Sequence, residues 1–356
     1  MPDTKREQVL SVRDLDITFK TTAGPVHAIR GVNIDLYKGE TVALVGESGS
    51  GKSVFTKSFM GLLDANGSIT SGTIDYYGAD DGKPIRLSDL KKEKDWLKVR
   101  GHEIAMIMQD PMTSLNPLKT IGDQIMEAVE LHQHLKGKAA REKTLEYLRD
   151  VGIADPEVRF AQYPHEFSGG MRQRVVIAIA VACNPQILIC DEPTTALDVT
   201  IQAQILQLLK EMQVKYNLTI VLITHDLGVV ANIADRVAVM YAGQIVEMTD
   251  TVTLFSRPRH PYTYGLMGSL PNEETAGTTL EAIKGSPPNL AHLPEGCPFS
   301  PRCKYACDLC RRERPALTEV EPGHLARCHR LDVTASFQGL IEVPDGAGRK
   351  EDTPHG

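Results

Sequence analysis

Short, almost purely apolar stretches recur along the chain and predict strands that are buried on both faces of a sheet. Parallel strands covered by helices have this character, whereas a strand with one wet face alternates apolar and polar residues. Together with the helical patterns that follow them, these stretches indicate an α/β domain. The predicted buried strands are Thr41–Val45, Ile104–Met108, Ile187–Glu192 and Leu218–Thr224.

Other segments alternate apolar and polar residues and predict antiparallel strands. Val9–Phe19 and Val26–Leu36 alternate in this way and are joined through Thr21–Pro25, which predicts a hairpin-like pair. Ser68–Tyr77 predicts a further strand. Two short apolar runs separated by Ala242-Gly243, at 237–240 and 244–247, predict a closing hairpin.

Helical periodicity is strongest in a segment that has no strand of its own. Ile121–Val151 places apolar residues at helical spacing and contains Gly137 as a break, so it predicts a helical insert lying beyond the sheet. Ile201–Val214 predicts an amphipathic helix and Val175–Cys183 an apolar one. The segment Asp80–Arg100 is charged, and Lys91–Asp95 within it is most simply the solvated face of a helix.

A glycine-rich loop follows the first buried strand and precedes a helix marked by Phe55 and Phe59. The loop fits G-x-x-x-x-G-K-[ST], in which backbone N–H groups surround a phosphate and the helix N-terminus adds positive potential. Lys52 would reach the β- and γ-phosphates, and the Ser53 hydroxyl would bind Mg²⁺. An ordinary glycine-rich turn is the alternative, which the strand–loop–helix context makes remote. The predicted nucleotide-binding residues here are Gly46, Glu47, Ser48, Gly49, Ser50, Gly51, Lys52, Ser53 and Val54.

Polar residues stand at the ends of the other buried strands, where open α/β sheets place their ligands. Asp191 would hold Mg²⁺, and the adjacent Glu192 would orient or deprotonate the attacking water. Gln109 could contact Mg²⁺ or that water, and His225 could bond to the γ-phosphate. Taken alone, Gln109 is equally a surface loop residue and His225 a satisfied polar residue.

Two further features extend the predicted nucleotide site. Phe19 could stack on an adenine ring, although a core aromatic on a strand is nearly as good an interpretation. Ser168, Gly169 and Gly170 open a helix and form a second terminus suited to an anion. One nucleotide needs one phosphate loop, so this second terminus suggests the nucleotide of a second subunit. The simpler alternative is a serine that only caps its helix.

Composition narrows the class of protein. The chain has 356 residues, enough for one large α/β domain with an appendage or for two domains, and 42% hydrophobic with 24% charged residues is typical of a soluble globular protein. A net charge of -7 argues against a nucleic-acid binder. The longest apolar run, Val175–Cys183, is too short to cross a bilayer, and the first residues lack the apolar core of a signal peptide. We therefore expect a cytosolic location.

The motifs taken together resemble those of an ATP-binding cassette ATPase. Gly46–Ser53, Gln109, Phe167–Gln173, Ile187–Glu192, Ala196–Asp198 and His225 match, in order, its Walker A loop, Q-loop, signature, Walker B with the catalytic glutamate, D-loop and H-loop. The resemblance spans roughly residues 9–255, and Phe167 and Met171 replace the Leu and Gln of the most common signature. It implies a P-loop NTPase with a mixed sheet core, an antiparallel β subdomain and a helical subdomain. Lys52, Gln109, Glu192 and His225 would be catalytic, with ATP and Mg²⁺ as cofactors and Ser53, Gln109 and Asp191 on the metal. Two such subunits would pair head to tail, so that Ser168–Gly170 act on the partner's ATP, with Asp198 in the D-loop beside them.

Longer phrases resemble the ATPases of bacterial oligopeptide and dipeptide importers. They are Gln109–Pro117, Tyr163–Arg174, Asp191–Gln204 and, at the start of a C-terminal extension, Arg259–Thr263. This resemblance implies a peripheral subunit on the cytoplasmic face of the inner membrane. Its implied partners are a second, paralogous ATPase subunit, two transmembrane permease subunits and an extracytoplasmic peptide-binding protein, with no nucleic acid. The implied domains are 1–257 for the ATPase, with a helical subdomain at about 112–166, then the extension at 258–335 and a disordered tail at 336–356.

Five of the seven cysteines gather in the proline-rich extension, where little apolar sequence surrounds them. In a reducing cytosol a metal is the natural way to order such a segment. Zinc would usually show more C-x-x-C pairs than the one that Cys307 and Cys310 supply. The subgroup's pattern for a [4Fe-4S] cluster matches Cys297, Cys303, Cys310 and Cys328, with Cys307 as the alternative ligand; zinc and free thiols remain the other interpretations.

Two other functions remain open at this point. Related importers carry nickel or other small solutes, and nothing in an ATPase subunit touches the cargo. A soluble cassette ATPase acting on nucleic acid or ribosomes usually has a long coiled-coil insertion or two cassettes in one chain, and this sequence shows neither.

Overall fold

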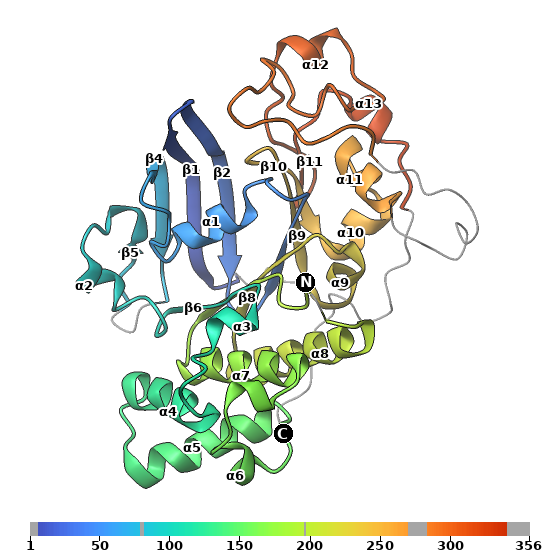
Figure 1. The fold of residues 1–356 in the computed structure, drawn as a ribbon. Coiled ribbons are helices and arrows are strands. Elements are labelled where there is room, and N and C mark those ends of the chain that lie inside the picture. Colours follow the sequence, from blue (N-terminus) through green and yellow to red (C-terminus); the bar gives the residue numbers. More distant parts are fainter. Residues whose placement is uncertain (1–5, 79–81, 196, 270–282, 340–356) are drawn as a thin grey trace.

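The computed structural model describes residues 6–78, 82–195, 197–269 and 283–339. Figure 1 shows a small antiparallel sheet beside a larger mixed sheet, a group of helices beyond the larger sheet, and an extension packed near its β9–β10 edge. None of the helices in these ranges has both the length and the apolar character that a membrane span requires.

The small sheet forms from the alternating segments near the N-terminus, as predicted. Its strand order is β2-β1-β4-β5, with each neighbouring pair antiparallel. Apolar side chains on one face of these strands are buried against the larger sheet and helix α1. The strands are β1 (Gln8–Thr21), β2 (Gly24–Tyr37), β4 (Gly67–Tyr76) and β5 (Ile85–Arg86).

The solvated helix face predicted at 91–95 overlaps a single-turn helix, and residues 91–94 are exposed. The wider charged segment forms β5, the 3-10 turn η1 (Leu87–Asp89) and the single-turn helix α2 (Glu93–Trp96). Leu87 and Trp96 are buried and anchor the segment to the small sheet, so packing rather than helical charge pairing organises it.

The larger sheet has the order β11-β12-β10-β9-β3-β8-β7-β6. Strands β6, β7, β8, β3 and β9 run parallel, which agrees with their apolar sequences, and β9–β10 is the predicted hairpin. The strands are β3 (Thr41–Val45), β6 (Ile104–Ile107), β7 (Ile187–Asp191), β8 (Thr219–Thr224), β9 (Arg236–Tyr241), β10 (Gln244–Asp250), β11 (Thr318–Glu321) and β12 (His324–Ala326).

Helices cover the larger sheet and form the predicted insert. A continuous apolar core joins β6, β7 and β8 to α4, α5, α7 and α8. Gly137 begins α5 at a φ of 55°, so the predicted break is the turn just before it. The helices are α1 (Lys52–Ser58), α3 (Pro111–Ser114), α4 (Ile121–His132), α5 (Gly137–Asp150), α6 (Pro156–Arg159), the 3-10 turn η2 (Pro164–Glu166), α7 (Gly169–Ala182), α8 (Val199–Tyr216), α9 (Leu227–Ile233) and α10 (Thr251–Ser256).

The C-terminal extension is joined to the preceding domain through the larger sheet. Strand β12 pairs with β10, and the buried Glu247 carboxylate on β10 contacts His324 Nε2 of β12 at 2.8 Å. The same carboxylate accepts a bond from the His260 backbone N–H. The extension therefore shares a core with the preceding domain. Its helices are α11 (Pro261–Met267), α12 (Asp308–Arg312) and α13 (Leu331–Thr334).

The domain limits given above remain predictions. Within the predicted tail, residues 340–356 lie outside the described part of the chain; α13 ends at Thr334, and the described chain continues to residue 339.

Candidate active site

The parallel strands bring most of the predicted site residues to one edge of the sheet. Strands β3, β6, β7 and β8 end at the same edge because they are paired in parallel register. The residues at or just beyond these ends line one open cleft of about 1140 Å³. They are Gly46–Ser53 without Ser50, together with Gln109, Asp191, Glu192 and His225. Ser50 is buried.

The phosphate-binding loop has glycine where the chain leaves no room for a side chain. A Cβ atom on Gly46 would lie 2.2 Å from the carbonyl oxygen of Met240 on β9. Gly51, just before α1, has a φ of 105° and its Cβ would lie 2.9 Å from the carbonyl oxygen of Ala28. The loop is therefore packed tightly against β9 and β2, and its backbone shape is fixed before any ligand binds.

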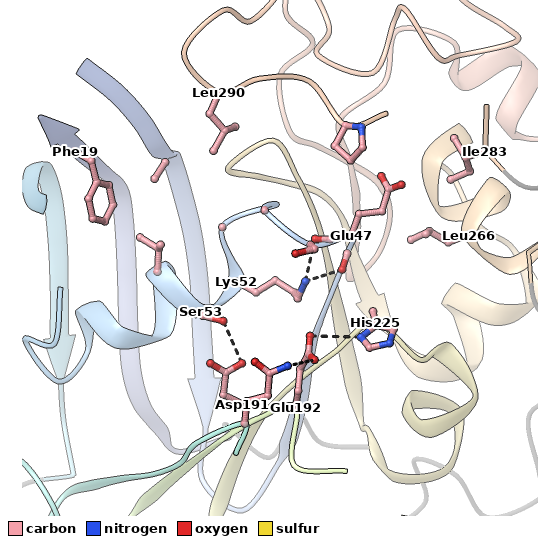
Figure 2. A pocket seen from close by; sticks show the side chains of 18 of the residues that line it. Phe19, Glu47, Lys52, Ser53, Asp191, Glu192, His225, Leu266, Ile283 and Leu290 are labelled. Atoms are coloured by element: carbon pink, nitrogen blue, oxygen red, sulfur yellow. Dashed lines mark hydrogen bonds and ion pairs between the residues drawn. The ribbon is translucent and has the colours of Figure 1, made fainter. Parts of the chain in front are cut away.

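Lys52 and Ser53 begin the helix after the loop and point toward the cleft (Figure 2). Lys52 is 6% exposed, and its Nζ donates to the backbone oxygens of Gly46 at 2.6 Å and Glu47 at 3.1 Å. Burial lowers the pKa of this ammonium group, against the opposing charges of nearby carboxylates. A phosphate would supply the negative charge that a buried ammonium lacks.

Ser53 and Asp191 form a pair suited to Mg²⁺. Ser53 Oγ donates to Asp191 Oδ1 at 3.1 Å. Burial raises the pKa of Asp191, the bond from Ser53 lowers it, and the charge of Glu192 raises it further. A divalent cation would stabilise the ionised carboxylate, and a carboxylate with a hydroxyl oxygen is the oxygen set that Mg²⁺ prefers. These two residues fit the predicted metal role.

Glu192 lies at the centre of a polar network. Its Oε2 accepts bonds from Gln109 Nε2 and Thr195 Oγ1, each at 3.0 Å, and its Oε1 lies 3.4 Å from His225 Nδ1 (Figure 2). The backbone of Glu192 has a φ of 47°, in the left-handed region that non-glycine residues rarely adopt. The network holds a carboxylate in the cleft in the orientation that a general base requires.

Gln109 contacts the predicted base, Glu192. Its predicted Mg²⁺ contact stays a prediction. Thr195 was not predicted, and no sequence signal distinguished it from the other polar residues of its loop.

Phe19 reaches the same cleft from the small sheet. It extends from β1 on the opposite side of the cleft from His225 (Figure 2). Val54 also lines the cleft, as predicted. An aromatic face is thus available beside the phosphate-binding loop, and its stacking on adenine stays a prediction.

The signature segment lies outside the chain's own cleft. Ser168 caps α7 through a bond from Met171 N to Ser168 Oγ at 3.3 Å, and Asp198 caps α8 in the same manner. An added Cβ atom on Gly169 would meet Leu197 of the D-loop, and one on Gly170 would meet Ile201 of α8. The signature therefore lies beside the D-loop and the start of α8. None of Ser168, Gly169, Gly170 and Asp198 lines the cleft. Their role toward a partner's ATP stays a prediction, and Ala196 lies outside the described residues.

The C-terminal extension also contributes to the cleft, which the sequence did not predict. Leu266, Ser269, Ile283, Pro287 and Leu290 line it. The sequence singled out only the neighbouring segment Arg259–Thr263, through its resemblance to importer ATPases. The five residues that line the cleft belong to no motif, so their position in the fold alone identifies them.

The cysteines of the extension lie near one another. Burial, together with the charges of the neighbouring Cys297, Cys303 and Cys310, raises the pKa of Cys328 to about 12. Cys307 Sγ lies 3.5 Å from Cys310 Sγ. Cys297 and Cys303 also pack at the edge of an apolar core, a contact that their surroundings in the sequence did not predict.

Within the described ranges, no group of three or more His, Cys, Asp or Glu side chains is arranged to hold a metal ion. Which of these cysteines would hold a metal or cluster stays a prediction.

Comparison with known proteins agrees with this geometry. A family described as ABC transporter matches residues 29–195, and one described as oligopeptide/dipeptide transporter, C-terminal region, matches residues 246–310. The chain is 52% identical to the dipeptide transport ATP-binding protein DppD of Bacillus subtilis, over 94% of this chain and 98% of that protein. It is 53% identical to the oligopeptide transport ATP-binding protein OppD of the same organism, over 96% and 94%.

Solved structures give the same fold. The ATP-binding cassette MJ0796, in a dimeric post-hydrolysis state bound to ADP and Pi, aligns with a TM-score of 0.58 at 29% identity, over 68% of this chain and 98% of that one. CbiO1 from Clostridium perfringens aligns with a TM-score of 0.59 at 29% identity, over 70% and 91%. The chain therefore belongs to the family of ATP-binding cassette transporter ATPases that carry the C-terminal region of oligopeptide and dipeptide transporters.

Proposed function

We propose that the chain is the ATP-hydrolysing subunit that powers a bacterial importer of dipeptides or oligopeptides across the cytoplasmic membrane. The observation that carries the proposal is similarity over more than nine-tenths of the chain to proteins named for dipeptide and oligopeptide transport. The match at residues 246–310 supports it outside the ATPase region, because that family is described as the C-terminal region of oligopeptide/dipeptide transporters.

The residues of the cleft divide the work of hydrolysis. Lys52 binds the β- and γ-phosphates, and Ser53 with Asp191 holds Mg²⁺, which neutralises the charge that develops on the phosphates. Glu192 accepts the proton of the attacking water, while Gln109 and His225 orient the carboxylate and the γ-phosphate. Phe19 stacks on the adenine ring.

A complete ATP site requires a second ATPase subunit. The segment Ser168–Gly170 lies outside this chain's cleft, with its helix N-terminus available to a nucleotide held by a neighbour. The two subunits pair head to tail around two ATP molecules, and the second is a paralogue of this chain. Closure on ATP binding and reopening after hydrolysis then drive the transport cycle.

The helical subdomain docks the permeases. Two large apolar side chains of this subdomain are available to a partner: Leu118 is 85% exposed and Leu131 is 65% exposed. Two transmembrane permease subunits would cover them, holding the chain at the cytoplasmic face of the membrane, and an extracytoplasmic peptide-binding protein would deliver the cargo.

Transport by the assembled importer tests this proposal. Vesicles containing the two permeases, both ATPase subunits and the binding protein should accumulate a labelled dipeptide or oligopeptide when ATP is inside the ATPase-facing compartment. The same vesicles with Glu192→Gln should not. Uptake of nickel with no uptake of any peptide would overturn the cargo assignment, and co-purification with nucleic acid in place of permeases would overturn the transport role.

We propose further that Cys297, Cys303, Cys310 and Cys328 hold a [4Fe-4S] cluster. Four cysteine thiolates are the ligand set of such a cluster, and these four influence one another's ionisation. Cys307 raises the pKa of Cys303 and its Sγ lies 3.5 Å from Cys310 Sγ, so it is the alternative ligand. The cluster would cross-link a segment with little regular structure.

Metal analysis decides between a cluster and zinc. Anaerobically purified protein should contain about four irons and four acid-labile sulfides per chain, with the visible absorption of an iron–sulfur protein. Zinc without sulfide would replace the cluster by a structural zinc site. If the protein contains neither metal nor sulfide, the cysteines are free thiols and this part of the proposal is refuted.

A further inference from the structure

The first non-glycine residue of the phosphate-binding loop is held by the C-terminal extension. Glu47 follows Gly46, and its backbone N–H donates to Tyr262 Oη of α11 at 2.9 Å. Its carboxylate accepts two bonds from Arg302, at 2.6 Å and 3.0 Å. Arg302 lies in the cysteine-rich part of the extension, 255 residues away along the chain. Two side chains of the extension therefore fix one residue of the loop.

Arg302 is buried and contacts several segments of the chain besides Glu47. Its side chain is 6% exposed and lies over the ring of Tyr241, whose centroid is 5.9 Å from the guanidinium carbon. Its remaining N–H groups donate to the backbone oxygens of Lys284 at 3.1 Å and Gly285 at 3.2 Å. The neighbouring Ile283 lines the ATP cleft, so Arg302 connects two different walls of that cleft.

The connection reaches the residue that binds phosphate. The backbone oxygen of Glu47 accepts a bond from Lys52 Nζ, while its amide and carboxylate are bound to the extension. A shift of Glu47 would therefore move both the loop backbone and the acceptor that orients Lys52. Because the ion pair with Arg302 is largely shielded from water, loss of the arginine leaves a carboxylate without its partner beside the phosphate site.

We propose that Arg302, assisted by Tyr262, is a positioning residue that sets the shape of the phosphate-binding loop and so couples the C-terminal extension to nucleotide binding. Coupling of this kind is reciprocal: an ordered extension strengthens nucleotide binding, and bound nucleotide stabilises the extension. Cys303 follows Arg302 directly, so a structural change at the cysteines reaches the ATP site through the Arg302 side chain. The inference rests on the ATP site alone and holds for any cargo and for any metal at the cysteines.

Nucleotide affinity of the full-length chain tests the coupling. Arg302→Ala should weaken binding of a fluorescent ADP analogue with Mg²⁺ by roughly 5- to 150-fold, the usual range for coupled sites. Arg302→Lys keeps the charge but loses the bidentate bond to Glu47. Its affinity for the ADP analogue should therefore lie between those of the unaltered chain and Arg302→Ala. Arg311→Ala is the matched control because the ion pair that Arg311 forms with Asp308 lies on the exposed surface, and this variant should bind as the unaltered chain does.

A double-mutant cycle separates positioning from general loss of structure. If Arg302 acts through Glu47, then Glu47→Gln combined with Arg302→Ala should bind no more weakly than Arg302→Ala alone. Effects that add in full would overturn the inference. So would unaltered affinity in a folded Arg302→Ala protein.

Hydrogen exchange on the unaltered chain tests the reciprocal effect without any variant, and so still answers if Arg302→Ala does not fold. Saturating Mg²⁺–ADP should slow amide exchange within residues 297–310 by several-fold or more. Exchange in that segment that ignores bound ADP would overturn the coupling. Neither experiment depends on the transported cargo, which the uptake assay tests separately.

Discussion

Replacement of Glu192 by glutamine isolates the chemical role of its carboxylate. The side chain keeps its shape, and the amide oxygen can still accept from Gln109 and Thr195 where Oε2 does now. The new NH₂ group then faces His225 Nδ1, which accepts when the ring carries its proton on Nε2. Every contact of the network therefore survives, and only the basic oxygen is lost.

The expected loss follows from that geometry. A positioned general base contributes roughly 10²- to 10⁴-fold to a rate, which corresponds to about 3–5 kcal/mol of transition-state stabilisation. Glu192→Gln should lower kcat by this factor. Nucleotide binding should change little, because Lys52, Ser53 and Asp191 keep their contacts, and a closed pair of subunits should accumulate with bound ATP.

Phosphate release by the assembled ATPase pair measures the effect, and retention of labelled ATP on gel filtration measures the closed state. The matched control is Glu142→Gln on the exposed surface of α5, where only a 3.7 Å pair with Lys138 is lost. Undiminished phosphate release by Glu192→Gln would refute the assignment of Glu192 as the base. Release that falls together with ATP binding would show a structural role in its place.

Three further predictions concern the fold and the extension. Burial lowers the pKa of His260 from 6.5 to about 3, so the unfolded chain binds a proton that the folded chain does not as pH falls through that window. Stability should therefore decline from pH 6.5 toward 3, and denaturant titrations of His260→Gln should show a shallower decline; equal slopes would contradict the burial of a neutral ring. Gly46→Ala should abolish ATP binding, because its Cβ would lie 2.2 Å from the Met240 carbonyl oxygen; equilibrium dialysis that finds normal binding would show that the loop tolerates a side chain. Cys303→Ser should lose bound metal and Cys307→Ser should retain it, as measured by metal content per chain; the reverse pattern would make Cys307 the ligand.

Much of the site could be predicted because its signals are local. The spacing of Gly46, Lys52 and Ser53 after an apolar strand specifies a phosphate-binding loop without knowledge of the rest of the fold. Asp191 and Glu192 close a strand whose parallel pairing determines which edge they occupy. The charged segment Lys91–Asp95 is predictable for the same reason: its local pattern indicated a solvated helix face, and residues 91–94 are exposed around the single-turn helix α2.

The sequence by itself determined the parallel core, the nucleotide chemistry and the pairing of β1 with β2, since each follows from residue periodicity or from a fixed spacing of a few residues. Only the tertiary structure decided that β12 of the extension joins the main sheet at β10 and that Arg302 binds Glu47. These contacts join segments separated by many residues, and single arginines, tyrosines and leucines carry no pattern that announces a distant partner. The physical reason is that packing selects such contacts from the whole surface of the folded chain, while sequence patterns record only what neighbouring residues require of one another.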